Sequence, residues 1–492
     1  MYERRQARWF ERTLFEYNLD DEEVNEVIKV LEEYLPSKLI RKKFLFPSLS
    51  EFEVVRHFTR LSQQNYGVDQ GLYPLGSCTM KYNPRVNEDI ASLDGFANLN
   101  PLQDPDEVQG LLELLYKLSE YLSKLTGMDY FSLQPAAGAQ GELVGVLIMK
   151  KYFEVKGENR NEVIVPDTAH GTNPASVKMA GLKVVEVPSN RDGIIDPKII
   201  RETVSDKTLG IMLTNPNTLG VYEDYIGEIA DIIHGSDGLL YYDGANLNAI
   251  LGWIRPGDMG FDITHVNLHK TFSTPHGGGG PGSGPVGVKS FLKDFLPVPI
   301  IEEVGGKYVF NWDLKHTIGK VHSFYGNVLI QLRALAYILR NGFEGLREVS
   351  GTALLNSNYL YEKLRSFNGV HPYPNNLKPR MHEFVLSVKE LKDKYDVRAR
   401  DIAKRIIDYG VYAPTIYFPT IVEEALMIEP TETASKKELD EFIDIFKMIL
   451  DEVVNEKDKV LNSPLNTSVR RIDDAYASRP KTMKPTYKWG ED

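Results

Sequence analysis

Short runs of β-branched and other apolar residues alternate with segments of helical periodicity between residues 128 and 290. The short runs predict strands, and the segments in which apolar residues recur every three or four positions predict helices. The expected strands are 162–166, 183–187, 208–214, 239–243 and 263–268, and the expected helices between them include 141–153, 197–204 and 226–234. This alternation indicates an α/β unit with a mostly parallel sheet flanked by helices, in which binding loops follow the carboxyl ends of the strands.

The pattern changes on both sides of this unit. Helical spacing covers 108–125 and 325–368, whereas 380–455 mixes expected strands at 382–388 and 425–428 with expected helices at 398–409 and 436–453. The expected parts are a helical arm with an active-site loop segment at 1–100, in which 20–30 is a capped helix, a large α/β domain at 101–345, a smaller C-terminal α+β domain at 346–461 and an extended tail at 462–492.

Composition places the chain among soluble globular proteins. Its 492 residues exceed what one hydrophobic core usually organises, and 42% of them are hydrophobic and 26% charged. Apolar runs such as 143–149 are too short to cross a membrane, and the net charge of −12 argues against an extensive nucleic-acid surface. We therefore expect no membrane and no nucleic acid among the partners.

The single cysteine, Cys78, excludes an intrachain disulfide and a cysteine-rich metal site, and fits a reducing cytoplasm. The N-terminus has no apolar signal core, and Glu3, Glu11 and Glu16 argue against a transit peptide. The expected location is therefore cytoplasmic. Cys78 lies in a polar loop, which favours a thiol at the entrance of a site over a small buried side chain.

A lysine follows the last expected strand of the α/β unit. Lys270 lies in the segment HVNLHKTF at 265–272, and the glycine-rich run HGGGGPGSG follows at 276–284. A desolvated lysine can act as a nucleophile, and glycine lets the backbone approach a ligand closely. The combination suits an enzyme that holds an aldehyde cofactor as a Schiff base, although a lone lysine is more often a surface charge. Alternation along the expected strand directs His269 and Lys270 to opposite faces.

Three further features precede Lys270, each with a functional and a structural interpretation. Small residues at 134–142 lead into a helix whose free N–H groups would cradle a phosphate, or they form an ordinary loop-to-helix junction. His170 follows an expected strand, where it would stack on a heteroaromatic ring or bond its own loop. Asp243 ends a buried strand, where it would pair with a protonated ring nitrogen or cap the next helix. Their order along the chain, ending in Lys270, favours the functional set.

Other interpretations of the same residues fail on spacing. The loop at 277–284 lacks the Lys-Ser/Thr pair of a Walker loop and the βαβ context of a dinucleotide fingerprint. His265 and His269 are four residues apart, but no general-base glutamate lies between them and the segment has a strand pattern. We therefore expect no metal site.

The order of cradle, histidine, aspartate and lysine resembles the fold-type I family of pyridoxal-phosphate enzymes. Longer strings resemble, more narrowly, the P-protein family of the glycine cleavage system, glycine dehydrogenase (decarboxylating). These strings are YPLGSCTMKYN at 73–83, LQPAAGAQGE at 133–142, AHGTNPAS at 169–176, YDGAN at 242–246 and NLHKTFSTPHGGGGPG at 267–282. The resemblance spans most of residues 50–460 and is to the C-terminal, cofactor-bearing half of the enzyme, called subunit 2 where the enzyme is split into two chains.

The resemblance implies a role for each of these residues. Lys270 would hold pyridoxal 5′-phosphate, Asp243 would keep the pyridinium nitrogen protonated, and His170 would stack on the ring. The N–H groups of 137–139, with the Gln140 side chain, would bind the phosphate. The implied cofactor-binding residues are Ala137, Gly138, Ala139, Gln140, His170, Asp243, Ala245 and Lys270, and the implied catalytic residues are Lys270, His170 and Asp243.

The implied activity is that of an oxidoreductase of glycine catabolism. It would decarboxylate glycine, release CO2 and transfer the aminomethyl group to the lipoyl group of H-protein. A companion subunit 1 and a two-plus-two heterotetramer are implied as well. Other classes stay open: another fold-type I amino-acid decarboxylase or desulfurase, and a non-catalytic structural subunit. The sequence leaves undecided which residues bind the glycine carboxylate and how His269 and His276 divide the proton handling.

Overall fold

The computed structural model describes residues 10–14, 17, 21–40, 47, 49–278, 280, 282–376 and 378–482. Four parts of the expectations lie outside the described residues: the N-terminus at 1–9, Asp20 at the start of the expected arm helix, Gly279 and Pro281 of the glycine-rich loop, and the end of the tail at 483–492.

A seven-stranded sheet in the order β1-β7-β6-β5-β4-β2-β3 forms the centre of the larger unit. Its strands are β1 (Tyr130–Ser132), β2 (Glu162–Pro166), β3 (Lys183–Val187), β4 (Thr208–Leu213), β5 (Leu239–Gly244), β6 (Ile263–Val266) and β7 (Val286–Val288). Strands β2 to β6 pair in parallel, whereas β7 is antiparallel to both of its neighbours. The expected mostly parallel sheet is confirmed. The sequence pattern does not predict β1 and β7, because three residues are too few to show a period.

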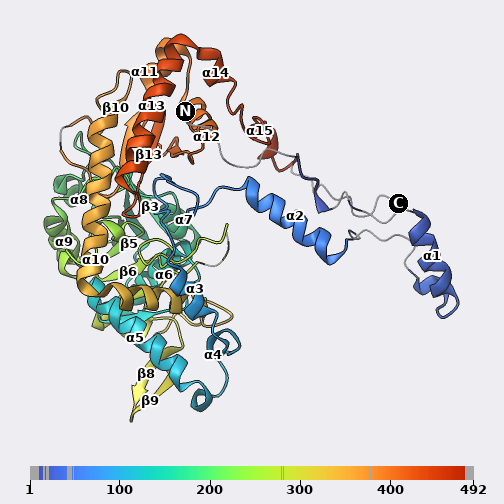
Figure 1. Ribbon diagram of the computed structural model, residues 1–492. Coiled ribbons are helices and arrows are strands. Elements are labelled where there is room, and N and C mark those ends of the chain that lie inside the picture. The colour runs from blue at the N-terminus through green and yellow to red at the C-terminus, as the bar shows by residue number, and fades with distance from the viewer. Residues whose placement is uncertain are drawn as a thin grey trace.

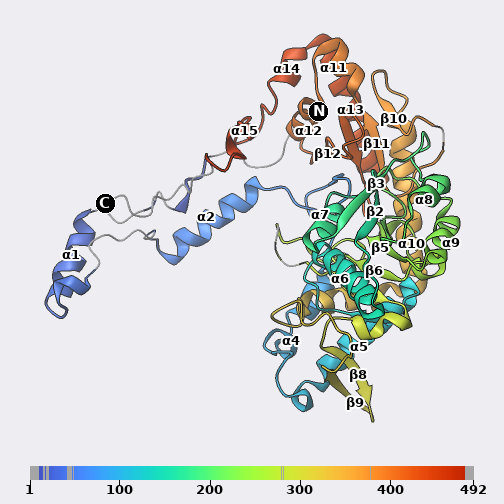
Figure 2. The same ribbon diagram turned by 180° about the vertical axis from the view of Figure 1, so that it is seen from behind.

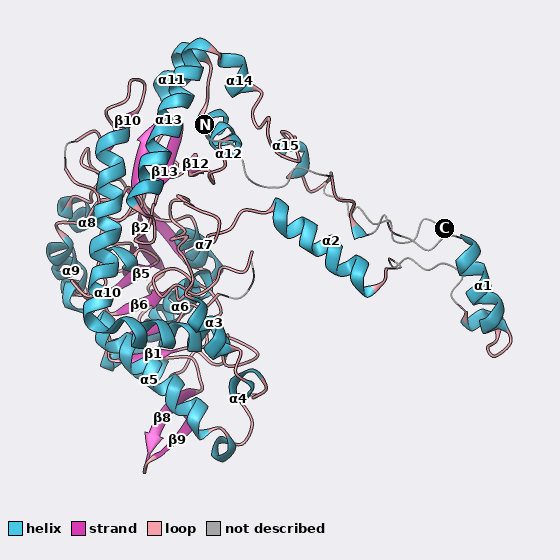
Figure 3. Cartoon of the chain, in the orientation of Figure 1, coloured by secondary structure: helices cyan, strands magenta, loops and turns pink. Residues whose placement is uncertain are grey.

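Helices cover both faces of this sheet, as Figure 3 shows for the cyan helices around the magenta strands. Successive residues of β5 point to opposite faces, so Tyr241 and Tyr242 belong to two different cores. The Tyr241 core includes α6 (Gly138–Lys156) and α7 (Thr172–Met179), and the Tyr242 core includes α5 (Gln109–Thr126), α8 (Pro197–Thr203), α9 (Ile226–Gly235) and the first half of α10 (Val328–Leu364).

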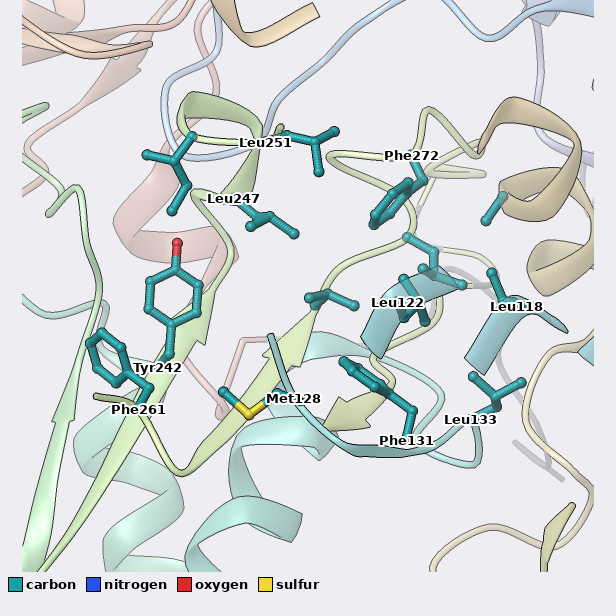
Figure 4. Packing of buried hydrophobic residues seen from close by; sticks show 14 of the residues in the cluster. Leu118, Leu122, Met128, Phe131, Leu133, Tyr242, Leu247, Leu251, Phe261 and Phe272 are labelled. Carbon is teal, nitrogen blue, oxygen red and sulfur yellow. The ribbon is translucent and has the colours of Figure 1, made fainter. Parts of the chain in front are cut away.

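Close packing in the second core is visible in Figure 4, where Tyr242 lies against Phe261. The centres of these two rings are 5.0 Å apart, and both side chains are fully buried. Burial of one such side chain contributes about 1.5–3 kcal/mol. These cores therefore hold the carboxyl end of β5, where Asp243 lies, in a fixed place.

The smaller unit is built on an antiparallel sheet. Its strands, in the order β10-β11-β13-β12, are β10 (His371–Tyr373), β11 (Phe384–Ser387), β13 (Ala425–Ile428) and β12 (Thr415–Ile416). Helices α11 (Lys389–Tyr395), α12 (Ala399–Asp408) and α13 (Lys436–Asn455) pack with this sheet. Helix α10 joins the two units and bends at Gly342, whose φ of 61° and ψ of −173° are readily reached only by glycine. The expected boundary between 345 and 346 lies just after this bend and stays a prediction.

The remaining elements lie at the edges of the two units. A hairpin of β8 (Ile300–Val304) and β9 (Lys307–Asn311) and the short helices α3 (Arg85–Ala91) and α4 (Asp94–Ala97) flank the larger unit. Helices α1 (Asp21–Glu32) and α2 (Glu51–Gln64) project from the body, and α14 (Lys457–Leu461) and α15 (Asp474–Ala477) leave the top of the smaller unit in the view of Figure 1 and again in Figure 2. Among the described helices, none has both the length and the apolar character that crossing a membrane requires.

Candidate active site

Lys270 lies in a tight turn directly after β6. Its N–H donates to the carbonyl of Asn267 at 3.1 Å. The strand expected at 263–268 is shorter, because β6 ends at Val266. The prediction that His269 and Lys270 point to opposite faces therefore loses its premise, since strand alternation does not apply in a turn.

The start of α6 approaches this turn and offers free backbone N–H groups. The first intrahelical bond runs from the N–H of Gly141 to the carbonyl of Ala137 at 3.0 Å. The N–H groups of residues 138–140 therefore have no acceptor within the helix. A Cβ atom on Gly138 would lie 2.7 Å from the Asn267 side chain, so glycine is needed for this close approach. The positive end of the helix dipole makes this start a suitable cradle for an anion.

The Gln140 side chain is engaged within the protein. Its Oε1 accepts from the N–H of Ala136, and its Nε2 donates to the carbonyl of Val321, each at 2.7 Å. The side chain thus ties the cradle to the segment before α10, which is a different task from the predicted phosphate contact. The backbone N–H of Gln140 is available to an anion, and the phosphate contact of its side chain stays a prediction.

Asp243 is the next-to-last residue of β5 and lies opposite His265 of β6 in the parallel register. Its Oδ2 accepts from Asn173 Nδ2 at 2.8 Å, and its Oδ1 accepts from the N–H of Ala245 at 3.0 Å and lies 3.4 Å from His265 Nε2. Burial raises the pKa of Asp243, but His265 and the two donors outweigh burial and hold it below its ordinary value. With Glu142 these residues form the large-domain acid cluster (Glu142, Asp243, His265), whose potential ligand atoms lie within 4.8 Å of one another.

Glu142, unlike Asp243, has a raised pKa and is protonated. Its Oε1 lies 2.8 Å from Thr172 Oγ1, and its Oε2 accepts from Asn173 Nδ2 at 3.1 Å. Burial, together with the nearby charge of Asp243, raises the pKa of Glu142 to about 8. Glu142 therefore holds a proton at neutral pH. Sequence reasoning missed this residue, and the available signal was a lone acid among the small and apolar residues of the α6 start.

A chain of short contacts joins Glu142 to His170. The N–H of Thr172 donates to His170 Nδ1 at 3.3 Å, which makes Nδ1 an acceptor. The Thr172 hydroxyl lies 2.8 Å from Nδ1 and donates to Glu142 Oε1 at 2.8 Å, so Thr172 connects His170 to Glu142. Burial lowers the pKa of His170. The network thus assigns a neutral ring with its proton on Nε2.

The small domain contributes a second buried group of the same composition. Because Phe384 pairs with Ile428 in the antiparallel register, Glu383 and Glu429 are the next pair along the two strands. With His382 they form the small-domain acid cluster (His382, Glu383, Glu429), whose potential ligand atoms also lie within 4.8 Å of one another. Burial raises the pKa of both carboxyl groups, that of Glu429 to about 7, and lowers the pKa of His382 to about 3.

Lys270 acts electrostatically on both clusters. In each case burial is the larger effect, but the lysine charge lowers the pKa of Asp243, Glu383 and Glu429. The tertiary structure therefore brings Lys270 close to both clusters, although the sequence pattern singles out only the first. The signal that sequence reasoning missed is an acid at the end of each of two buried strands of the small domain.

Two imidazoles and the thiol complete the surroundings of Lys270. The rings of His269 and His276 meet edge to face with their centres 5.4 Å apart. Burial, with the Lys270 charge, lowers the pKa of His269 to about 3 and that of His276 to about 4, so both rings are neutral. Burial also raises the pKa of Cys78 to about 11 against the opposing effect of Lys270. The thiol is therefore protonated at neutral pH.

Several buried polar atoms around Lys270 have no hydrogen-bond partner among the described residues. They are Asn173 Oδ1, Asn267 Oδ1, Thr271 Oγ1, Thr274 Oγ1, His276 Nε2 and Ser283 Oγ. Buried polar atoms are rarely left unpaired, so their gathering indicates the place of a polar ligand. The residues fit pyridoxal phosphate. The cradle suits its phosphate, Asp243 suits its protonated ring nitrogen, and the Lys270 amine suits its aldehyde.

Comparison with protein families agrees with this chemistry. Residues 17–315 match the family described as glycine cleavage system P-protein, and residues 349–469 match the family described as glycine dehydrogenase, C-terminal domain. A Pyrococcus furiosus protein, named a probable glycine dehydrogenase (decarboxylating) subunit 2, is 54% identical over 99% of this chain and 97% of its own length.

Solved structures share the fold. Glycine decarboxylase (P-protein) of the glycine cleavage system, in an inhibitor-bound form, has a TM-score of 0.71 at 21% identity, covering 89% of this chain and 100% of that one. A C-DES variant with glycine covalently linked to its PLP cofactor has a TM-score of 0.60 at 15% identity, covering 77% and 97%. At such identities the likeness is one of fold, and it confirms the expected fold-type I architecture.

Proposed function

The chain belongs to the P-protein family of the glycine cleavage system, and on that premise we propose how its residues carry out the family's reaction, the pyridoxal-phosphate-dependent decarboxylation of glycine. The observation that carries the residue assignment is the arrangement around Lys270. An amine, a buried carboxylate that keeps its charge and a set of free helix N–H groups come together from three separate elements. A structural subunit without activity would have no need of this costly arrangement.

Pyridoxal phosphate, when bound, supplies a protonated ring that accepts the electron pair released as glycine loses CO2. Lys270 would bond the aldehyde carbon and, once displaced by the glycine amine, would be free to move protons. The carboxylate of Asp243 would keep the proton on the ring nitrogen, and the N–H groups of 138–140 would bind the phosphate. Ala245 acts through its N–H, which bonds Asp243 at 3.0 Å and so fixes the carboxylate.

The imidazoles serve as neutral groups in this assignment. His170, held by Thr172, would lie on the face of the ring, and Glu142 would hold Thr172 in place by accepting from its hydroxyl. His269 and His276 have pKa values lowered to about 3 and about 4, so neither ring carries a proton at neutral pH. These two rings are our candidates for proton handling or for positioning beside the Lys270 amine.

We further propose that the aminomethyl group passes to the lipoyl group of an H-protein and that a companion subunit 1 completes a two-plus-two heterotetramer. The family names of the relatives support a companion, since they are called subunit 2. The arm supplies a surface for it: Phe52, Val55 and Phe58 lie along one side of α2 and are 56%, 58% and 52% exposed. A cytoplasmic location is proposed from the single-cysteine composition.

The first test is the absorbance of the purified chain after loading with pyridoxal phosphate. A band near about 400–430 nm should appear and should be lost in Lys270→Ala. Lys178→Ala, which removes an exposed lysine from α7 of the same domain, is the matched control and should keep the band. A band that survives Lys270→Ala unchanged would refute the lysine assignment.

The second test is the exchange of labelled bicarbonate into the carboxyl group of glycine, with lipoylated H-protein and the companion subunit present. Exchange that depends on all three proteins and on Lys270 supports the proposal. A chain that binds the cofactor but shows no exchange in this complete mixture would point to decarboxylation of another amino acid.

A further inference from the structure

The segment at 75–81, which we call the strap, runs along the small domain and leads toward the Lys270 turn. The N–H of Gly76 donates to the carbonyl of Met427 at 3.2 Å, and Thr415 Oγ1 donates to the carbonyl of Gly76 at 2.8 Å. Leu75 forms a bridge with Ile428 of β13. The strap is therefore bonded to the end of β13 in the small-domain sheet, although it lies about 340 residues from that sheet in the sequence.

The middle of the strap has an unfavourable backbone conformation. Ser77 and Thr79, on either side of Cys78, have φ values of 66° and 50°. Residues other than glycine rarely adopt positive φ, and they keep it only where surrounding contacts hold them. The conformation around Cys78 therefore depends on groups outside the strap.

The two carboxyl groups of the small-domain acid cluster hold the strap in this conformation. Glu383 Oε2 accepts from the N–H of Ser77 at 2.8 Å. Glu429 Oε2 accepts from the N–H of Thr79 at 2.9 Å, and its Oε1 accepts from Thr79 Oγ1 at 2.6 Å. Both glutamates are fully buried, so water cannot replace them as acceptors. Glu383 Oε1 also accepts from Asn246 Nδ2 at 3.2 Å, which links the strap to the loop after β5 in the large domain.

The charges around this pair require it to hold a proton. Two carboxylates within 4.8 Å of each other in a buried place repel strongly. His382, at 4.0 Å from Glu383 and 3.8 Å from Glu429, is neutral and provides no counter-charge. Lys270 favours the ionised forms, whereas Glu432 raises the pKa of Glu429 and is itself paired with Lys81 at 2.7 Å. One proton shared by the pair removes the repulsion and leaves oxygen atoms free to accept from the strap.

We propose that Glu383 and Glu429 together form a clasp that locks the strap, and with it Cys78, beside Lys270, so that the small domain completes the active site. The two glutamates are positioning residues, because they act through the strap. The catalytic meaning of the clasp rests on the proposed function, whereas its existence is testable without cofactor.

Cys78 is the only cysteine in the chain, so its rate of modification reports directly on the strap. The experiment is alkylation of the full-length, cofactor-loaded chain by iodoacetamide at pH 7, with the Cys78 peptide quantified by mass spectrometry. Glu383→Ala and Glu429→Ala each leave a backbone N–H of the strap without its acceptor, so we expect modification to become about tenfold faster or more. Equal rates in these variants and in the unchanged protein would overturn the proposal.

Two matched variants separate the clasp from a general loosening of the small domain. Glu383→Gln keeps an oxygen for the N–H of Ser77 and is neutral like the protonated acid, so it should stay within about threefold of the unchanged protein. Glu424→Gln alters a buried acid at the other end of β13, which bonds the N–H of Ala399 at 2.8 Å and not the strap. It should leave the rate unchanged, and an increase as large as that of Glu429→Ala would refute the clasp.

A milder variant keeps the proposal testable if the alanine variants fail to fold. Thr79→Val removes only the hydroxyl bond to Glu429 and leaves both carboxyl groups in place. We expect a rate increase of about threefold, which is smaller than that of the alanine variants because the N–H bond is kept. The same rates measured in the chain that has not been loaded with pyridoxal phosphate distinguish a failed clasp from a failed functional assignment.

Discussion

The two acid clusters near Lys270 have the same composition, one histidine and two carboxyl groups, and different electrostatic states. In the large-domain acid cluster, Asp243 is ionised, because Asn173 and Ala245 donate to it and His265 lies beside it. In the small-domain acid cluster the pKa values of both carboxyl groups are raised, and His382 has no hydrogen-bond partner among the described residues.

The difference teaches that composition does not set the charge of a buried cluster. Burial raises the pKa of the carboxyl groups in both clusters, and only Asp243, which has His265 beside it as well as two donors, has a pKa below its ordinary value. In the proposed function, Asp243 of the large-domain acid cluster keeps a negative charge for a cationic ring. The small-domain acid cluster receives backbone N–H groups from Ser77 and Thr79 and is arranged to hold the chain.

The largest expected difference between the clusters is in catalysis. Asp243→Asn keeps the size of the side chain and removes the charge that would face the ring nitrogen, so glycine-dependent bicarbonate exchange should fall about 10²–10³-fold. Glu383→Gln removes no charge that the protonated pair needs and should lower exchange by less than about tenfold. Steady-state exchange rates at saturating glycine check both. Comparable losses in the two variants would contradict the distinction between the clusters.

The second difference concerns pH and stability. Glu142 has a pKa of about 8 in the folded chain against an ordinary 4.5, so between these values the native state binds a proton that the unfolded state has lost. The free energy of unfolding therefore falls as pH rises through this window, by up to about 1.4 kcal/mol per pH unit. Glu142→Gln should remove the contribution of Glu142, which changes with pH up to about pH 8. Glu429→Gln should remove the contribution of Glu429, which changes with pH only up to about pH 7.

Urea unfolding of both variants at pH 5, 6, 7 and 8, beside the unchanged protein, measures these contributions. Stability curves that run parallel to that of the unchanged protein over this range would show that neither carboxyl group holds an extra proton in the folded state.

The smallest expected difference distinguishes the two histidines. His265 Nδ1 lies 2.6 Å from the hydroxyl of Tyr241, so His265→Leu leaves that buried hydroxyl unpaired and should cost about 1–3 kcal/mol. His382 has no such partner among the described residues, and His382→Leu should change stability by less than about 1 kcal/mol. Urea midpoints give the comparison. A larger loss for His382→Leu than for His265→Leu would show that His382 has a partner of its own.

Sequence reasoning succeeds where an element and its chemistry are local. The strand that ends at Asp243 and the small residues before α6 each stand out within about ten residues, and a parallel sheet brings strand ends together at one edge. The same reasoning extends β6 past Val266, because Asn267 and Leu268 continue an apolar pattern while the backbone already turns. It does not reveal the partners of the Gln140 side chain, one of which lies in a loop far along the chain.

Glu142, Glu383 and Glu429 are not predicted, because the task of a carboxyl group depends on its neighbours. The partners of Glu142 lie about 30 residues away, and those of Glu429 lie 350 residues away. No periodicity or motif length connects such positions. An acid beside a buried strand is, in sequence, indistinguishable from an acid that caps a helix or faces water.

The sequence by itself determined the alternation of strands and helices between 128 and 290, the family and the candidate lysine, because these depend on local periodicity and on contiguous strings of residues. The tertiary structure alone decided which carboxyl group near Lys270 is charged, which carries a proton and which holds the strap. The physical reason is that ionisation is governed by burial and by donors from distant segments, and both exist only after the chain has folded.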